Sequence, residues 1–260
     1  MKKVALITGA SSGIGLELAK IHAEKGGDLV LVARSTSKLK DLQSELQEKF
    51  GIEVLSVPKD LSIPDSALEL YDFVKEQGVH VEYLINNAGF GDFGFFHETE
   101  WEKEEMMINL NMLTLTHLTK LFGSDMVKKR SGRIMNLAST ASFQPGPLMS
   151  IYYATKHYVL SFSEGIANEW KEFGVSVTAL CPGPTKSGFQ AAATIEESKL
   201  VKGKKLPTSS EVAEYGYEAM MKGKTVAIHG LQNRLLANSV KFMPRDMVTN
   251  TVRKMQEKSH

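Results

Sequence analysis

The sequence predicts an α/β fold, in which a doubly wound parallel sheet of about seven strands carries helices on both faces. Short β-branched segments alternate with longer segments of helical period along most of the chain. The strand segments are unbroken apolar runs, such as residues 4–7 and 29–32, which is typical of strands buried on both faces. The connections are mostly short, and no linker or shift in composition indicates a second domain.

The elements follow one another in a regular order. Strands are expected at residues 3–8, 28–33, 53–58, 81–86, 133–138, 175–181 and 225–229. Helices are expected at residues 13–25, 37–50, 63–77, 100–128 and 151–172. The main body of the domain would then comprise residues 1–230. It includes a long Lys-, Ala- and Ser-rich connection at residues 185–210, whose length indicates a lid or binding loop. Residues 231–260 would form a helical extension of the same domain, divided by Pro244.

Composition and charge argue against several classes of protein. The 260 residues carry a formal charge of +1 with Lys and Arg spread along the chain, so there is no electrostatic case for binding nucleic acid or an anionic membrane. Cys181 is the single cysteine, and no Cys/His cluster has metal-site spacing. No segment approaches the roughly 18 apolar residues of a transmembrane helix, and Gly9 ends the first apolar run too early for a secretory signal. We therefore expect a cytoplasmic protein without a metal site.

A glycine-rich loop joins the first strand to the first helix, with the spacing G-x-x-x-G-x-G. Gly9 would permit the tight turn, Gly13 would let the backbone approach a pyrophosphate, and Gly15 would allow close helix–strand packing. The start of the helix adds free N–H groups and a partial positive charge. The alternative is a plain turn, but the position between strand and helix favours a dinucleotide site. The loop residues expected to contact the cofactor are Gly9, Ser11, Ser12, Gly13, Ile14 and Gly15.

The second strand ends at Arg34 and Ser35, where an acidic residue would bind a ribose 2′-hydroxyl and an arginine suits a 2′-phosphate. This position favours NADP(H) over NAD(H), the alternative being a solvated surface arginine. Asp60, followed by Leu61, could accept a hydrogen bond from the adenine amino group, or could cap the next helix, for which Ser62 is equally suited.

The fourth strand is followed by two asparagines and two small residues. Asn87, Ala88 and Gly89 could let the adenosine ribose pass close by, while Asn86 and Asn87 could tie neighbouring strands together. The alternative for such an Asn- and Gly-rich run is a simple turn.

Tyr152 and Lys156 lie four residues apart at the start of a helix and therefore on one helical face. A nearby ammonium favours the phenolate of a tyrosine, so the pair could act as a general acid/base unit. Alone, this spacing is common in ordinary amphipathic helices. Ser139, which ends the fifth strand at the same sheet edge as the glycine loop, makes a reaction centre the better interpretation.

At this point the sequence resembles the classical short-chain dehydrogenase/reductase family. The resemblance covers roughly residues 3–230. Its elements, in order, are the loop of residues 8–15, Asp60, the run 86–89, Asn111, Ser139, Tyr152, Lys156 and Pro182-Gly183. It implies an extended Rossmann fold with a catalytic domain over residues 1–230 and one active site per subunit.

The resemblance also implies roles for the matching residues. Tyr152 would exchange a proton with the substrate oxygen, and Ser139 would polarise that oxygen. Lys156 would bind the nicotinamide ribose and lower the tyrosine pKa. Asn111 would hold a water molecule that connects Lys156 to solvent. Asn109 competes for this role, and the alternative for Asn111 is a polar residue that only distorts its helix.

The segment after the sixth strand resembles the family's nicotinamide-covering segment, with Pro182, Gly183, Thr185 and Ser187 as expected contacts. The family usually has Thr where this chain has Ser187, and often Val or Ile in place of Thr185. The hydroxyl of Ser187 keeps the polar contact, but which of the two side chains meets the carboxamide or the phosphates stays open.

The substrate is expected between loops 90–98, 140–150 and 188–206. The apolar side chains of these loops are Phe90, Phe93, Phe95, Phe96, Phe143, Leu148 and Met149. They either line the mouth of the site or pack onto helix 100–128. No cation stands by motif to capture a carboxylate, so a neutral, apolar ketone, aldehyde or alcohol is expected.

The predicted function is an NADP(H)-dependent oxidoreductase that interconverts a carbonyl compound and an alcohol. The alternatives are a non-catalytic nucleotide-sensing or scaffold protein on the same fold, and an epimerase or dehydratase that uses the same Tyr–Lys pair. The resemblance also implies a homodimer or homotetramer. The apolar stripes of the extension are expected to pack on the protein's own pocket or on a second copy rather than on a membrane. They comprise Leu231, Leu235, Leu236, Val240 and Met243, followed by Met247, Val248, Val252 and Met255.

Overall fold

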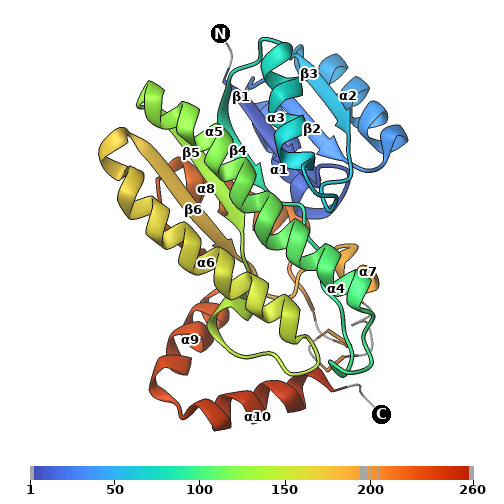
Figure 1. Cartoon of the computed structure of the whole chain (residues 1–260), viewed down its shortest axis with the longest axis vertical. Helices are drawn as coiled ribbons and strands as arrows, with labels where there is room; N and C mark the ends of the chain where they lie inside the picture. Colours follow the sequence, from blue (N-terminus) through green and yellow to red (C-terminus); the bar gives the residue numbers. More distant parts are fainter. Residues whose placement is uncertain (1–2, 194–197, 200, 204, 258–260) are drawn as a thin grey trace.

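The chain folds around one sheet of seven parallel strands, in the order β3-β2-β1-β4-β5-β6-β7 (Figure 1). The computed structural model describes residues 3–193, 198–199, 201–203 and 205–257. The strands are β1 (Val4–Thr8), β2 (Leu29–Ala33), β3 (Val54–Pro58), β4 (Val81–Asn86), β5 (Gly132–Leu137), β6 (Val175–Cys181) and β7 (Val226–Ile228). The order reverses between β1 and β4, which confirms the predicted doubly wound sheet.

Helices cover both faces of this sheet. The helices are α1 (Gly13–Glu24), α2 (Thr36–Phe50), α3 (Ser66–Glu76), α4 (Trp101–Ile108), α5 (Leu115–Lys129), α6 (Ser150–Trp170), α7 (Phe189–Ala192), α8 (Ser209–Met221), α9 (Leu231–Ser239) and α10 (Arg245–Gln256). One buried cluster joins α1, α2 and α8 to the sheet, and a second joins α3, α5 and α6 to its other face. Successive strand residues serve opposite clusters, as Leu6 and Ile7 do, because side chains alternate across a strand.

The predicted helix 100–128 is not continuous. A π-helical segment, η1 (Asn109–Thr114), separates α4 from α5. Such wider turns occur frequently at functional sites, and here the turn contains the buried side chain of Asn111. The expected helix distortion at Asn111 is therefore present.

The predicted helix 63–77 is shorter than expected. Helix α3 begins only at Ser66, after Asp65 in a left-handed conformation with φ of 63°. Neither Asp60 nor Ser62 is its N-cap, so the capping alternative for both residues is wrong.

The C-terminal extension lies at one end of the molecule (Figure 1). Helix α9 is followed by a short 3-10 turn, η4 (Val240–Phe242), and α10 begins directly after Pro244. Among the described residues, no helix is both long enough and apolar enough to cross a membrane.

Candidate active site

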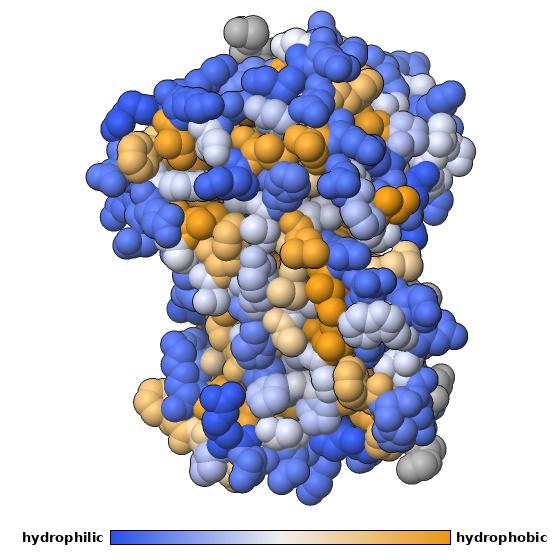
Figure 2. Space-filling view, in the orientation of Figure 1, coloured by the Kyte–Doolittle hydropathy of each residue, from blue (hydrophilic) through white to orange (hydrophobic). Residues whose placement is uncertain are grey.

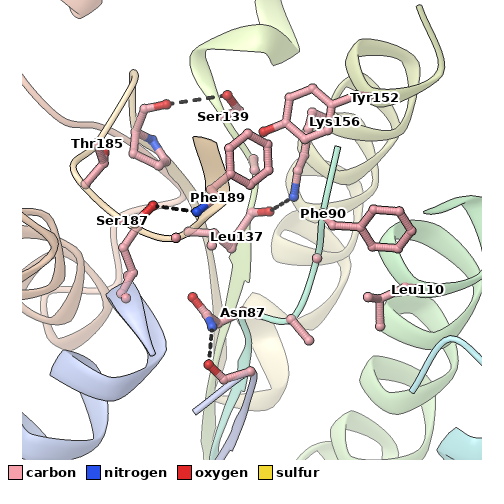
Figure 3. A pocket seen from close by; sticks show the side chains of 18 of the residues that line it. Asn87, Phe90, Leu110, Leu137, Ser139, Tyr152, Lys156, Thr185, Ser187 and Phe189 are labelled. Carbon is pink, nitrogen blue, oxygen red and sulfur yellow. Dashed lines mark hydrogen bonds between the residues drawn. The ribbon is translucent and has the colours of Figure 1, made fainter. Parts of the chain in front are cut away.

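One large cavity, of about 720 Å³, lies at the carboxyl edge of the sheet, where the loops after β1 to β6 converge. Ligands of open α/β sheets bind at this edge. Most of the predicted site residues line the cavity, and several are labelled in Figure 3. They are Gly9, Ser11, Ser12, Gly13, Ile14, Arg34, Ser35, Asp60, Leu61, Asn87, Ala88, Gly89, Ser139, Tyr152, Lys156, Pro182, Gly183, Thr185 and Ser187. Gly15 and Asn111 are not among the lining residues.

The glycine loop has the geometry of an anion cradle. Gly9 and Gly13 have φ of +66° and +58°, a left-handed conformation that glycine adopts without strain. A Cβ atom at Gly15 would lie 2.5 Å from the carbonyl oxygen of Gly9, so only glycine lets α1 approach the loop this closely. Ser12 precedes α1 without a side-chain capping bond, which leaves the first helical N–H groups available to a diphosphate.

Positive charge gathers at the end of the cavity beside β2 and β3. Arg34 and Lys38 both line it, and neither forms an ion pair with a carboxylate of the described residues. Burial by itself would raise the pKa of Asp60, but two hydrogen bonds from Ser62 and the charge of Arg34 outweigh it and lower the pKa. Asp60 is therefore ionised and can accept a hydrogen bond from a ligand.

The two asparagines after β4 tie strands together, as one of the sequence interpretations expected. Asn86 Nδ2 donates to Asn136 Oδ1 of β5 and to Thr119 Oγ1 of α5, both at 2.9 Å. Asn87 Nδ2 donates to the carbonyl oxygen of Thr8 in β1, also at 2.9 Å. These bonds hold β1, β4 and β5 together at the cavity, and Figure 3 shows the bond that Asn87 donates.

Tyr152 and Ser139 both line the cavity, and they come from neighbouring elements. Helix α6 places Tyr152 in its first turn, and Ser139 follows β5 as the cap of a short 3-10 turn, η2 (Thr140–Phe143). Burial raises the pKa of Tyr152 to about 12, and a hydrogen bond with Ser139 opposes the rise. Without a ligand, the phenol is therefore protonated at neutral pH, which suits a proton donor.

Lys156 lies one helical turn beyond Tyr152. Its Nζ donates to the carbonyl oxygen of Leu137 at 2.7 Å and lies 5.8 Å from the centre of the Tyr152 ring. Burial lowers the pKa of this lysine to about 8. Because a pKa of about 8 still lies above neutral pH, the lysine stays largely protonated there. Its charge is nevertheless far easier to remove than that of an exposed lysine.

Asn111 stands behind these residues in the π-helical turn. Its Nδ2 donates to the Phe90 carbonyl oxygen at 3.0 Å and to Thr155 Oγ1 at 3.2 Å, while its Oδ1 accepts from the Phe90 N–H at 3.3 Å. A Cβ atom at Gly89 would lie 2.8 Å from this Oδ1 and 3.6 Å from Lys156 Nζ. Asn111 is thus a neighbour of Lys156 across Gly89, and it fixes the start of loop 90–98.

The part of the cavity around Phe90 and Met149 is largely apolar. Of the loop residues expected either here or packed onto helix 100–128, Phe90 and Met149 line the cavity, whereas Phe93, Phe95, Phe96, Phe143 and Leu148 do not. Phe95 and Phe96 are exposed, and Arg253 of α10 stacks on Phe95 at 4.9 Å. The apolar and aromatic lining residues of this part are Phe90, Met106, Leu110, Met149, Tyr153, Phe189, Val201, Leu236, Ala237 and Met255.

Comparison with known proteins decides the family. A model of the short chain dehydrogenase family matches residues 3–198. The chain belongs to the short-chain dehydrogenase family. A 2-dehydro-3-deoxy-D-gluconate 5-dehydrogenase of Bacillus subtilis is 35% identical over 70% of this chain and 70% of its own. A very-long-chain 3-oxoacyl-CoA reductase of Rattus norvegicus is 32% identical over 68% of this chain, but the match spans only 58% of that reductase, less than two thirds of its length.

Solved structures agree with this assignment. A short-chain dehydrogenase from Sphingobium yanoikuyae in complex with NADPH has a TM-score of 0.83 and 30% identity, and the match covers 92% of both chains. A short-chain dehydrogenase/reductase from Burkholderia phymatum in complex with NAD has a TM-score of 0.80 and 27% identity, covering 93% of this chain and 95% of that one. The family therefore binds nicotinamide dinucleotides, and both forms occur among these neighbours.

The site of this short-chain dehydrogenase contains further residues that the sequence interpretation missed. Gln190 donates to the Thr185 carbonyl oxygen and accepts from the Ser187 N–H at 3.3 Å, so it holds the segment after β6 in place. Asn233 of α9 donates to the His229 carbonyl oxygen at 2.8 Å and lies against Gly183. Gln190 and Asn233 were missed because they lie outside the family motifs on which the sequence interpretation was based. The position of Lys38, four residues after Arg34, could have indicated its place beside the cavity.

Proposed function

We propose that this protein is an NADP(H)-dependent oxidoreductase that interconverts an apolar ketone or aldehyde and its alcohol. The observation that carries the proposal is that Ser139, Tyr152 and Lys156 line one part of a cavity whose far end contains Arg34, with Lys156 Nζ 5.8 Å from the centre of the Tyr152 ring. The glycine cradle, with its uncapped helix start, fits a dinucleotide. When bound, the nicotinamide ring would give or accept the hydride.

The chain's own residues would handle the proton. A protonated Tyr152 can donate its phenolic hydrogen to the substrate oxygen, and Ser139 can donate a second hydrogen bond that orients that oxygen. The cation of Lys156 then stabilises the phenolate that remains on Tyr152 after the transfer. Proton transfer in the opposite direction serves alcohol oxidation.

The preference for NADP(H) rests on charge. Arg34 directly follows β2, and Lys38 lines the same part of the cavity, so these two cations could bind a 2′-phosphate. Neither cation forms a close ion pair with a carboxylate of the described residues, although the charge of Arg34 acts on that of Asp60. The residues that would hold the rest of the cofactor are Gly9, Ser11, Ser12, Gly13, Ile14, Gly15, Ser35, Asp60, Leu61, Asn87, Ala88, Gly89, Tyr152, Lys156, Pro182, Gly183, Thr185 and Ser187.

The proposed substrate is neutral and apolar. Of the Lys and Arg side chains that line the described cavity, Lys156 belongs to the reaction centre and the other three, Arg34, Lys38 and Lys59, lie beside β2 and β3. A substrate carboxylate would therefore lack a counter-ion near Tyr152. The lining by Phe90, Met149 and Phe189 suits hydrocarbon instead.

We also propose a homodimer or homotetramer that uses the face formed by η1, α5 and α6. Leu113 is 60% exposed on this face, where the same face of a second copy could cover it. Sedimentation velocity of the wild type should give a dimer or tetramer, and Leu113→Glu should shift it toward monomer. A wild type that sediments as a monomer at micromolar concentration would contradict this part of the proposal.

The function is tested with a panel of bulky apolar ketones and their alcohols, each assayed with NADPH, NADH and the oxidised forms. We expect NADPH consumption with at least one apolar ketone and weaker activity with NADH. A nucleotide-sensing protein would bind NADPH, as seen by its fluorescence, without turnover of any carbonyl compound. That result would overturn the proposed function.

A further inference from the structure

Helix α9 turns apolar side chains away from the protein. Its inner side is marked by Ala237, which is 4% exposed, and by Asn233, which is bonded to His229. Leu231 and Leu235 lie on the opposite side of the helix, because residues four apart share a face. They are 71% and 64% exposed, and Phe242 in η4 is 87% exposed. Figure 2 shows apolar side chains at the lower left of the molecule, where α9 lies in Figure 1.

The same segment is positively charged. The chain has no Asp or Glu between Glu218 and Asp246. Arg234, Lys241 and Arg245 are exposed in this interval, and none of them forms an ion pair with a carboxylate of the described residues. The net charge of +1 for the whole chain conceals this local excess of cations.

This apolar and basic surface adjoins the mouth of the cavity. Leu236 is 59% exposed and also lines the cavity, and its neighbour Ala237 lines the cavity from the inner side of α9. Helix α9 is therefore a wall of the site on one side and a solvent-exposed apolar face on the other.

We propose that α9 and η4 dock the protein on the surface of an anionic phospholipid membrane. The α9 surface comprises Leu231, Leu235 and Phe242 with Arg234, Lys241 and Arg245. Apolar side chains that enter the headgroup region beside cations that meet lipid phosphates are the features of an interfacial helix. Three apolar side chains and three cations would give weak, reversible binding that is sensitive to salt.

A second copy of the chain fits this surface less well. A two-fold contact uses the same patch on both subunits, so it would bring the cations Arg234, Lys241 and Arg245 of both copies together. No acidic residue of the 219–245 interval is available to pair with them. An anionic membrane supplies the missing negative charge.

Docking would have a consequence for the substrate, which rests on the proposed function. The cavity mouth at Leu236 would open beside the bilayer, so an apolar ketone dissolved in lipid could enter without crossing water. Docking itself does not require turnover, and Tyr152→Phe should bind vesicles as well as the wild type does.

The test is co-sedimentation of the full-length protein with two kinds of vesicle. One is phosphatidylcholine alone, and the other is an equal mixture of phosphatidylcholine and phosphatidylserine. We expect binding to the mixed vesicles, loss of most of it at high salt, and little binding to phosphatidylcholine alone. Leu235→Glu should weaken the partition about tenfold, and Lys241→Gln about fivefold.

Ile63→Glu is the matched control, because Ile63 is 58% exposed but lies in the loop before α3. It should bind like the wild type. Three outcomes would overturn the proposal: no sedimentation of the wild type with mixed vesicles, equal binding by Leu235→Glu, or a wild-type dimer that Leu235→Glu dissociates without any vesicle binding. The last outcome would assign the surface to a second copy.

Discussion

The ammonium group of Lys156 donates a hydrogen bond to the carbonyl oxygen of Leu137 at the end of β5, over 2.7 Å. This bond orients the lysine toward the ring of Tyr152, whose centre lies 5.8 Å from Nζ. The strand thus positions the helix residue on which the proposed acid/base chemistry depends. Burial acts on the two groups in opposite ways, since it lowers the pKa of Lys156 to about 8 and raises that of Tyr152 to about 12.

The pKa of Lys156 predicts a pH dependence. As the pH rises through about 8, the free enzyme loses the ammonium charge, so kcat/KM for NADPH should fall about tenfold per pH unit above that value. Steady-state kinetics between neutral and alkaline pH measure this break. Lys156→Arg serves as the control, because a guanidinium stays protonated throughout this range. A break of the same size and position in that variant would rule out Lys156 as its source.

Cofactor choice should depend on Arg34. In Arg34→Asp a carboxylate replaces the cation expected to bind the 2′-phosphate, so kcat/KM should fall about 10- to 100-fold with NADPH and rise with NADH. The two values are measured with the same ketone. Lys40→Asp makes the same charge change at an exposed position of α2 that does not line the cavity, and should leave the preference unaltered. An unchanged preference in Arg34→Asp would exclude the role proposed for Arg34.

Asn111 should support both stability and the site. Asn111→Leu leaves the Phe90 N–H and carbonyl without their partners, which should lower the free energy of unfolding by about 1–3 kcal/mol. Loop 90–98 begins at Phe90, so the KM for the ketone should also rise. Urea denaturation and steady-state kinetics give the two quantities. Unchanged stability would mean that water replaces these bonds at no cost.

His22 predicts acid sensitivity far from the site. Its Nε2 lies 2.8 Å from the Lys3 carbonyl oxygen and its Nδ1 lies 3.0 Å from the Tyr217 hydroxyl, an arrangement that suits the neutral ring. Burial lowers the pKa of His22 below its ordinary value of 6.5. The unfolded chain therefore binds a proton that the folded chain does not, and stability falls as the pH drops below 6.5 toward the folded pKa.

Urea denaturation at a series of pH values from neutral downward measures this effect. His22→Gln lacks the titrating group, so its stability should be lower at neutral pH but should change less over the same interval. If wild type and variant showed the same slope, other groups would be responsible for the acid sensitivity.

Much of this architecture could be predicted from local patterns. Strands such as β1 and β2 are unbroken apolar runs, and glycines at positions 9, 13 and 15 are each required by a turn or a close contact. Such features are determined by residues that are close together in the sequence. They can therefore be located from a single amino-acid sequence.

Features that depend on distant contacts could not be predicted in the same way. The π-helical turn at Asn111 accompanies hydrogen bonds to Phe90 and Thr155, which are far away in sequence. The aromatic residues of loop 90–98 were expected either at the cavity mouth or on helix 100–128, but Phe95 instead meets Arg253 of α10. Leu236 and Met255 of the extension form part of the wall in their place.

The central claim is that Tyr152 is the proton donor of a reaction centre completed by Ser139 and Lys156. The most direct test is the single-turnover rate of ketone reduction by Tyr152→Phe with NADPH already bound, its binding being measured separately by fluorescence. We predict unchanged NADPH affinity within about twofold and a rate lowered by about 10²- to 10⁴-fold. Reduction at the wild-type rate by Tyr152→Phe would contradict the account.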